Sequence, residues 1–334
     1  MLVRAFNADS RSFARTGALL LAFVVACPLA SSVQEPQPPA PPGGTVRVEV
    51  EVVSVYCTVK EKNGRLVGDL EAKDFEIRED GKKQELRYFA RETDRPLTLA
   101  LLVDTSISQQ EVLGAEKTTA AQFLEQILRP SDLALLMTFD VNVDLLQDFT
   151  QQADRLESAL GRARINAPVD LGPFPRSGPA GTRLYDAVYL AAREKLGPEV
   201  GRKAIILVSD GVDAGSRVSE KEALEVAQRA DTMIYAIGIA DPDYYWRTSG
   251  RSYGGSGTLK KLAEETGGRA IFPSGPEKLQ EAFAQIAAEL RSQYSLGYTP
   301  TNRTRDGRFR KIEIKVNRSG LRVQARRGYY APRS

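Results

Sequence analysis

Residues 97–108 read LTLALLVDTSIS and give the clearest indication of the fold. The first seven residues form an almost unbroken apolar run in which polar and apolar side chains do not alternate. Such a strand is buried on both faces, which is typical of a parallel sheet covered by helices on both sides. An acid and then hydroxyl side chains follow at once. The stretch therefore predicts a buried parallel strand that presents oxygen groups at its carboxyl end.

Apolar runs alternate with amphipathic stretches from this strand onward, up to about residue 292. The pattern predicts an α/β fold: a doubly wound, Rossmann-like domain over residues 94–292, with a mostly parallel six-stranded sheet. We expect strands at 97–103, 133–139, 143–149, 204–208, 233–239 and 270–272, and helices at 111–128, 153–163, 184–196, 220–229, 259–265 and 276–293.

Strict alternation of side chains takes over in the two flanks of this domain. Residues 46–59 read VRVEVEVVSVYCTV and residues 312–316 read IEIKV. A period of two predicts strands with one buried face. The two ends of an inserted domain usually lie close together. We therefore expect the N-terminal segment 45–93 and the C-terminal segment 293–334 to form one small antiparallel β module.

The N-terminal residues are typical of an exported protein. Three arginines precede the apolar run TGALLLAFVVA at 16–26, which is shorter than the roughly 20 residues of a membrane-spanning helix. This arrangement predicts a signal peptide over residues 1–32, followed by a Pro-rich linker at 33–44. Cleavage near Ser32 would give a secreted or periplasmic protein. The alternative is a lipoprotein anchored to the membrane through lipidation at Cys27.

Composition excludes several classes of function. The chain has 46 Lys and Arg against 43 Asp and Glu, a balance that gives no electrostatic basis for binding nucleic acid. It has no histidine, which excludes Ser-His-Asp and Cys-His catalysis. Its two cysteines, Cys27 and Cys57, cannot build a disulfide framework or a thiolate zinc site. Cys57 lies in an apolar run and is expected to be a buried, inert thiol.

Oxygen-bearing side chains gather at the ends of two expected strands and before one expected helix. They are Asp104, Ser106, Ser108, Thr182 and Asp210. The carboxyl ends of parallel strands meet at one edge of a sheet, where ligands of such folds bind. Carboxylates and hydroxyls without nitrogen or sulfur suit Mg²⁺ or Mn²⁺ and disfavour zinc. Two acids balance a divalent ion, so water or a partner's oxygen would complete its ligands.

The same residue types also have an ordinary structural use. Asp and Ser after a strand are common turn and helix-cap residues. Three further acids lie nearby in the sequence. We expect Asp186 to be structural. For Asp140 and Asp213 the alternatives are acids on the rim of the same site and solvated loop acids, and we expect the second.

The residues at these positions resemble, in order, spacing and context, the metal-ion-dependent adhesion site (MIDAS) of von Willebrand factor A (VWFA) domains. The matching pieces are DTSIS at 104–108, Thr182 in GTRLYDAV and Asp210 in LVSDGVD. The flanks, including KDFEIREDGKKQ and ARRGYYAP, resemble a bacterial exported group of VWFA-related proteins. The resemblance implies a protein-binding module that engages an acidic residue of its partner through the bound metal.

Three functions follow from these observations. The first is a metal-dependent, adhesion-type module that is not an enzyme and binds a protein ligand presenting a carboxylate. The second is an envelope scaffold whose metal only stabilises loops. The third is a Mg²⁺-dependent hydrolase with Asp104 as nucleophile. Ser106 stands where such phosphatases commonly carry a second acid, which disfavours the third function.

A long aromatic segment is the candidate for ligand selection. Residues 241–257, DPDYYWRTSGRSYGGSG, are long for a strand-to-helix connection, and long loops of this kind are often functional. Aromatic side chains on a Gly- and Ser-rich backbone are typical of binding loops. We expect a rim around the metal made of Tyr244, Tyr245, Trp246, Tyr253 and Phe174. The alternative is that these rings pack onto the domain as a lid.

Overall fold

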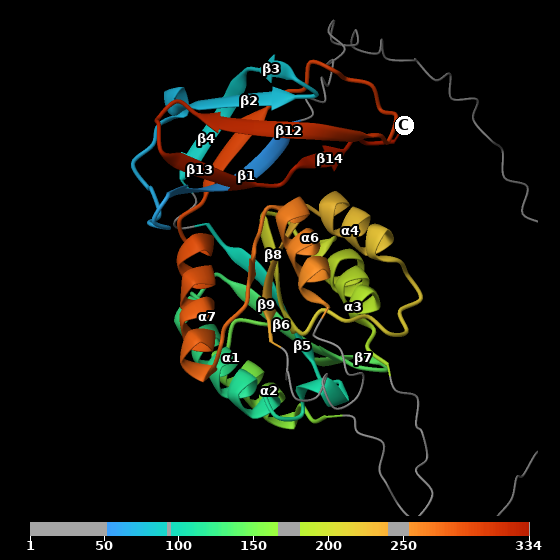
Figure 1. The fold of residues 1–334 in the computed structure, drawn as a ribbon. Helices are drawn as coiled ribbons and strands as arrows, with labels where there is room; N and C mark the ends of the chain where they lie inside the picture. The colour runs from blue at the N-terminus through green and yellow to red at the C-terminus, as the bar shows by residue number, and fades with distance from the viewer. Residues whose placement is uncertain (1–51, 92–94, 166–180, 240–253, 334) are drawn as a thin grey trace, which may run out of the picture. The chain divides into compact units, whose positions relative to one another are not determined.

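The computed structural model describes residues 52–91, 95–165, 181–239 and 254–333 (Figure 1). The expected signal peptide 1–32, the linker 33–44 and Cys27 lie outside these ranges and remain predictions. Within the described ranges, no helix is long and apolar enough to cross a membrane.

A six-stranded sheet forms the centre of the α/β part, in the order β10-β9-β8-β5-β6-β7. Its pairs are parallel except that β7 runs antiparallel to β6. Every residue of β5 and β8 is buried, as the unbroken apolar runs predict. The strands are β5 (Leu97–Asp104), β6 (Leu133–Phe139), β7 (Val143–Thr150), β8 (Arg202–Ser209), β9 (Thr232–Gly238) and β10 (Ala270–Ile271).

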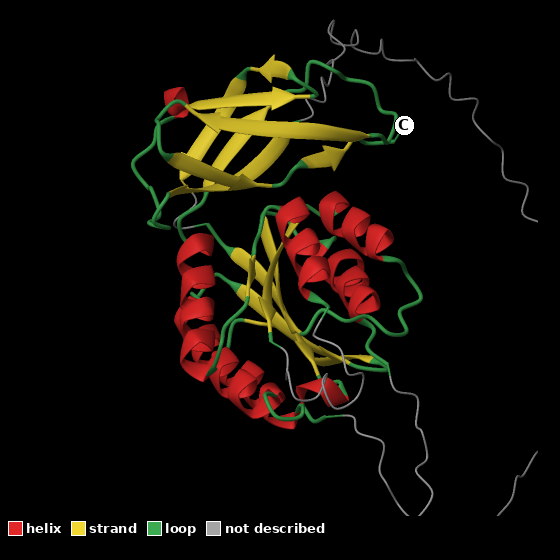
Figure 2. Ribbon diagram, viewed as in Figure 1, coloured by secondary structure: helices red, strands yellow, loops and turns green. Residues whose placement is uncertain are grey.

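Helices cover both faces of this sheet (Figure 2). Alternate residues of β5 point to opposite faces: Leu99 and Leu101 pack in one core with Phe123 and Phe283, and Leu102 packs in a second core with Leu184. The first core takes α1 (Leu113–Ile127), α2 (Ala153–Arg162) and α7 (Pro276–Leu290), and the second takes α3 (Leu184–Leu190), α4 (Glu220–Arg229) and α6 (Ser256–Thr266). A π-helical stretch, Ala191–Leu196, extends α3. The mixed α/β architecture with a mostly parallel sheet is confirmed.

The flanking segments pair with each other, as expected, and their strands form two antiparallel sheets. One sheet has the order β13-β1-β11-β4 and the other β14-β12-β2-β3, so each combines strands from both flanks. Val55 and Ile77, one from each sheet, share a core with Tyr298. The strands are β1 (Val53–Glu61), β2 (Phe75–Glu79), β3 (Lys82–Gln84), β4 (Leu86–Arg91), β11 (Tyr294–Tyr298), β12 (Phe309–Val316), β13 (Leu321–Ala325) and β14 (Gly328–Tyr330).

Sequence patterning missed the two shortest strands of the flanking segments, β3 and β14. The sequence KKQ of β3 is polar and does not alternate, so it gives no strand signal. The turn at Asp80 and Gly81 joins β2 to this short strand, with φ values of 47° and 79°. Two consecutive positive φ angles are those of a tight two-residue hairpin, for which Asp-Gly is a favoured sequence.

Cys57 has the buried position expected of it. Its side chain is 1% exposed, and burial raises the pKa of the thiol to about 12. Almost no reactive thiolate therefore exists at neutral pH.

A chain shortened to residues 1–292 would remove β11–β14. β1 would lose both of its neighbours, and β2 and β4 would each lose a partner from the C-terminal segment. We expect the amides of β1 and β2 to lose protection from hydrogen exchange, because two or three strands without a covering partner are marginal in water. β5 and β8 should stay protected as in the full chain. Protected β1 amides in the shortened chain would contradict this dependence.

Candidate metal centre

The centre lies where β5 and β8 end. These strands are parallel neighbours, and Val103 lies opposite Val208 in the ladder. Asp104 is the last residue of β5, and Asp210 directly follows Ser209, the last residue of β8. Both carboxylates therefore emerge at the same edge, as the sequence predicts.

A chain of hydrogen bonds joins four of the five predicted ligands. The Ser106 amide donates to Asp104 Oδ1 at 2.9 Å, and Ser108 Oγ donates to Asp210 Oδ2 at 2.6 Å. Ser106 Oγ and Ser108 Oγ lie 3.0 Å apart. All four side chains are buried. The DxSxS spacing works because the chain turns into a short 3-10 helix, Ile107–Gln109, which brings the second serine back over the first.

Thr182, the fifth predicted ligand, is joined through its backbone to the segment that follows Asp210. Its amide donates to the Ala214 carbonyl at 3.2 Å, and the Ala214 amide donates to the Thr182 carbonyl at 2.9 Å. This pair fastens the chain before α3 to the segment that follows Asp210. Within the part of the chain that the structure describes, no side-chain hydrogen bond joins Thr182 to the other four residues.

Ser209 belongs to the centre and was missed by the sequence analysis. Its hydroxyl donates to Asp104 Oδ2 at 2.6 Å and accepts from the Gly211 amide at 2.9 Å. It is the last residue of an apolar strand, and only the register between β5 and β8 shows that it faces Asp104.

Asp140 differs from its expected role as a solvated loop acid. It is 6% exposed, and its carboxylate accepts from Thr105 Oγ1 and from the Asn142 amide, both at 2.9 Å. Its carbonyl also accepts from the Arg183 amide at 2.8 Å. Asp140 is therefore a buried brace that holds the residues next to Asp104 and Thr182.

The two remaining acids have local structural roles. Asp186 Oδ1 accepts from the amides of Arg217 and Val218 at 2.8 and 3.1 Å, which is the structural use expected of it. Asp213 is only partly buried, and it accepts from the Tyr185 amide at 3.2 Å and from Ser216 Oγ at 2.5 Å.

Electrostatics at the centre favour a cation. Burial, and then the negative charge of Asp210, raise the pKa of the Asp104 carboxyl to about 7. Both oxygens of the nearby Glu116 carboxylate are buried without a hydrogen-bond partner. The positive charge of a divalent ion would favour the ionised form of Asp104 and would offset the charge of the unpartnered Glu116 carboxylate. The residues present therefore fit an oxygen-bound metal. The described residues hold no group of three or more His, Cys, Asp or Glu placed to bind a metal. Hydroxyls and water would therefore have to supply the remaining ligands.

The expected rim cannot be placed. Phe174, Tyr244, Tyr245, Trp246 and Tyr253 all lie outside the described residues, and their role stays a prediction.

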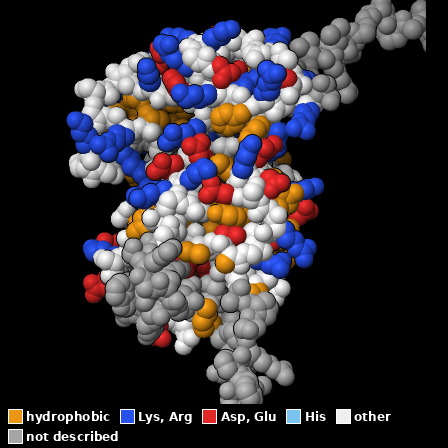
Figure 3. All heavy atoms as spheres, turned by 45° about the vertical axis from the view of Figure 1, so that its right-hand side comes forward, with side chains coloured by type: hydrophobic (Ala, Val, Ile, Leu, Met, Phe, Trp, Pro, Cys, Tyr) orange, Lys and Arg blue, Asp and Glu red, His pale blue; other side chains and the backbone are white. Residues whose placement is uncertain are grey.

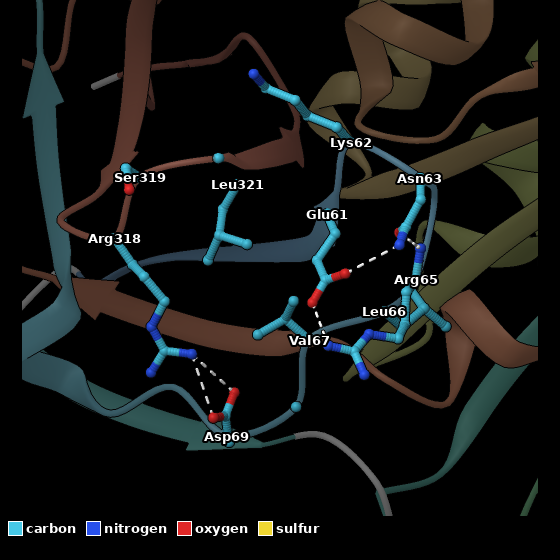
Figure 4. Close-up of a pocket in the computed structure, with 12 residues that line it drawn as sticks. Glu61, Lys62, Asn63, Arg65, Leu66, Val67, Asp69, Arg318, Ser319 and Leu321 are labelled. Atoms are coloured by element: carbon cyan, nitrogen blue, oxygen red, sulfur yellow. Dashed lines mark hydrogen bonds and ion pairs between the residues drawn. The ribbon is translucent and has the colours of Figure 1, made fainter.

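A groove of about 710 Å³ lies among the flanking β strands (Figure 4). It is lined by residues 61–69 and by the turn at 318–321. Arg318 donates to both carboxylate oxygens of Asp69 at 3.2 Å, and Arg65 pairs with Glu61. Because each of these acids is already paired with an arginine there, the groove offers no distinctive set of ligand-binding groups. The strand ends remain the candidate site.

No protein-family model and no curated protein matches the chain. Among solved structures, it is similar to the conserved hypothetical protein BatB from Bacteroides thetaiotaomicron, with 15% identity over 58% of this chain and 98% of that chain, at a TM-score of 0.45. It is also similar to proximal thread matrix protein 1 from the mussel byssus, with 13% identity over 70% of this chain and 50% of that chain, at a TM-score of 0.46. A structure of this mussel protein with a zinc-occupied MIDAS motif gives 14% identity over 60% and 50% of the two chains, at a TM-score of 0.45. This chain thus spans half the length of the mussel protein.

The raised pKa of Asp104 predicts how the metal-free protein responds to pH. The folded state holds the proton up to about pH 7, whereas an ordinary Asp carboxyl loses it near 3.8. The folded state thus binds more protons between these values, so this group stabilises the fold at low pH and loses that effect as pH rises through 7.

Asp104→Asn stays neutral and can keep both hydrogen bonds, since its amide can donate to Ser209 Oγ. In EDTA, we expect the variant to be more stable relative to wild type at pH 8 than at pH 5: the difference in free energy of unfolding, variant minus wild type, should be larger at pH 8 by more than about 1 kcal/mol. Urea denaturation at the two pH values measures the difference. If the free energies of unfolding of Asp104→Asn and wild type differed by the same amount at both pH values, the pKa of Asp104 would be that of an ordinary Asp.

Proposed function

We propose that this chain is an exported, VWFA-like module that binds a divalent cation and, through it, a carboxylate of a partner protein. The observation that carries the proposal is the buried cluster at the ends of β5 and β8. There Ser108 bonds Asp210, Ser209 bonds Asp104, and the two serines of DxSxS lie 3.0 Å apart. Buried hydroxyls and acids gathered at a sheet edge are a set of hard ligands.

In this proposal the cation is Mg²⁺ or Mn²⁺. Ser106, Ser108 and Thr182 would bind it directly, and Asp104 and Asp210 would act partly through water. The bound ion supplies a positive charge that attracts an outside carboxylate. Ser209 and Asp140 hold the ligands in place, one through Asp104 and the other through Thr105 and the Arg183 amide.

The position of Asp104 supports a binding module over a hydrolase. Its side chain is 0% exposed, and each of its oxygens accepts a hydrogen bond within the cluster. A nucleophilic carboxylate needs an oxygen free to reach a substrate. The absence of histidine from the whole chain also removes the commonest general base.

Surface charge supports a protein partner over nucleic acid. On the face shown in Figure 3, Lys and Arg side chains lie among Asp and Glu side chains. Binding to a phosphate backbone needs basic side chains gathered in one patch or stripe. The proposed partner is therefore a protein at the cell envelope or outside the cell, reached from a secreted or periplasmic protein or from one lipidated at Cys27.

A scaffold with a structural metal is the second candidate. The hydrogen bonds within the cluster favour it, because Ser108 already donates to Asp210 without a partner protein being bound. Chelation separates the two candidates. Partner capture from an envelope extract should be lost in EDTA if the module is metal-dependent, whereas capture that survives EDTA would favour the scaffold.

Asp104→Ala should abolish Mn²⁺ binding, because it removes a carboxylate and frees Ser106 and Ser209 to reorient. Isothermal calorimetry with Mn²⁺ measures the loss. Asp154→Ala, which removes an exposed acid of α2, is the matched control and should bind like wild type. Equal Mn²⁺ affinity in Asp104→Ala and wild type would reject the site.

Tyr245→Ser combined with Trp246→Ser tests the proposed rim. We expect weaker partner capture, with unchanged Mn²⁺ affinity and melting temperature, because aromatic side chains supply contact area at low entropic cost. A large fall in melting temperature would show instead that the rings belong to the core.

A further inference from the structure

Glu116 is a buried acid that the sequence analysis did not single out. It lies in the first turn of α1, and its side chain is 1% exposed. The same helix buries Ala120, Phe123 and Leu124 in the core beneath the central sheet. An apolar residue would suit that face, so a glutamate there needs a physical reason.

Both carboxylate oxygens of Glu116 lack a hydrogen-bond partner in the described structure. No Lys or Arg side chain pairs with it among the described residues. Leaving a buried carboxyl group without a partner costs free energy, and more so when the group is charged. Glu116 therefore either destabilises the core or has a partner that is not part of the chain, such as a bound ion or water.

The surroundings of Glu116 indicate which partner that is. Burial first, then the negative charges of Asp104 and Asp210, raise the pKa of Glu116 well above its usual value. The acids that act on it are thus the two carboxylates of the candidate metal centre. A cation at that centre would lie in the field of all three groups.

We propose that Glu116 is a positioning residue of the metal centre that accepts hydrogen bonds from water molecules completing the shell of the cation. The inference rests on the proposed function and deepens it. Glu116 acts through water because the described residues hold no three acids placed around one ion. Mg²⁺ and Mn²⁺ favour such a role, since hard cations of this kind keep several of their waters.

This role predicts a measurable loss of affinity. Groups that hydrogen-bond to metal ligands typically change metal affinity 10- to 100-fold when they are mutated. Glu116→Gln keeps the size of the side chain and removes its capacity for negative charge. We expect the Kd for Mn²⁺, measured by calorimetry on the full chain, to rise about 10- to 100-fold. The metal-free melting temperature should be unchanged or higher, because the substitution removes an acid from a buried acidic cluster.

Glu125→Gln is the matched control, because it makes the same chemical change at an exposed position of α1. It should leave both the Kd and the melting temperature as in wild type. Glu116→Asp keeps the carboxylate and should bind Mn²⁺ more tightly than Glu116→Gln. The rise in melting temperature on adding Mn²⁺ should shrink in Glu116→Gln in step with its weaker binding.

Three results would overturn the inference. Wild-type Mn²⁺ affinity in Glu116→Gln would show that Glu116 has no part in the centre. An Asp variant that binds no better than the Gln variant would assign the effect to packing. A wild-type protein that does not bind Mn²⁺ at all would reject the proposed metal centre and this inference with it. The first two results would leave the proposed function standing.

Discussion

β5 pairs with β8 in parallel, and the geometry of the candidate centre follows from this pairing. It buries two apolar strands side by side and brings their carboxyl ends to one edge. Asp104 and Asp210 then have to share a small volume, and burial raises the pKa of Asp104 to about 7. The hydroxyls of Ser209 and Ser108 stabilise the two neighbouring carboxylates by donating a short hydrogen bond to each of them.

Several hydrogen bonds fix the chain around these neighbouring acids. Asp140 is buried, and its carboxylate accepts hydrogen bonds from the Thr105 hydroxyl and the Asn142 amide. The backbone pair between Thr182 and Ala214 joins two loops that would otherwise be independent. Groups that are fixed before a ligand arrives lose less entropy on binding it. A cluster of buried acids and hydroxyls costs stability, and under the proposed function the binding of a cation would offset that cost.

The flanking strands pair across the two ends of the chain. The α/β part begins and ends near the same place, so β4 and β11, which border it in sequence, can pair with each other. Each of the two antiparallel sheets then mixes strands from both ends of the chain. A buried contact crosses between these sheets: the hydroxyls of Tyr298, in one sheet, and Tyr329, in the other, both donate to Glu79, at 2.8 and 2.9 Å.

Local patterning was sufficient for the elements and for most of the centre. Unbroken apolar runs identify β5 and β8, and the DxSxS spacing places Ser106 and Ser108 beside Asp104, because these signals lie within a few consecutive residues. It was insufficient for β3 and β14, whose three residues each carry too little periodicity to detect. It also did not show that the flanking strands divide into two sheets, because partner choice among strands depends on packing.

Sequence patterning was therefore enough for the mixed α/β class, for the six-stranded sheet and for four predicted ligands that the structure joins by hydrogen bonds. Only the tertiary contacts show that Ser209 faces Asp104, that Asp140 is a brace and that Glu116 is a buried acid without a hydrogen-bond partner among the described residues. The physical reason is distance along the chain. Ser209 and Asp104 are 105 residues apart in sequence, and only the register of two neighbouring strands brings the hydroxyl within 2.6 Å of the carboxylate.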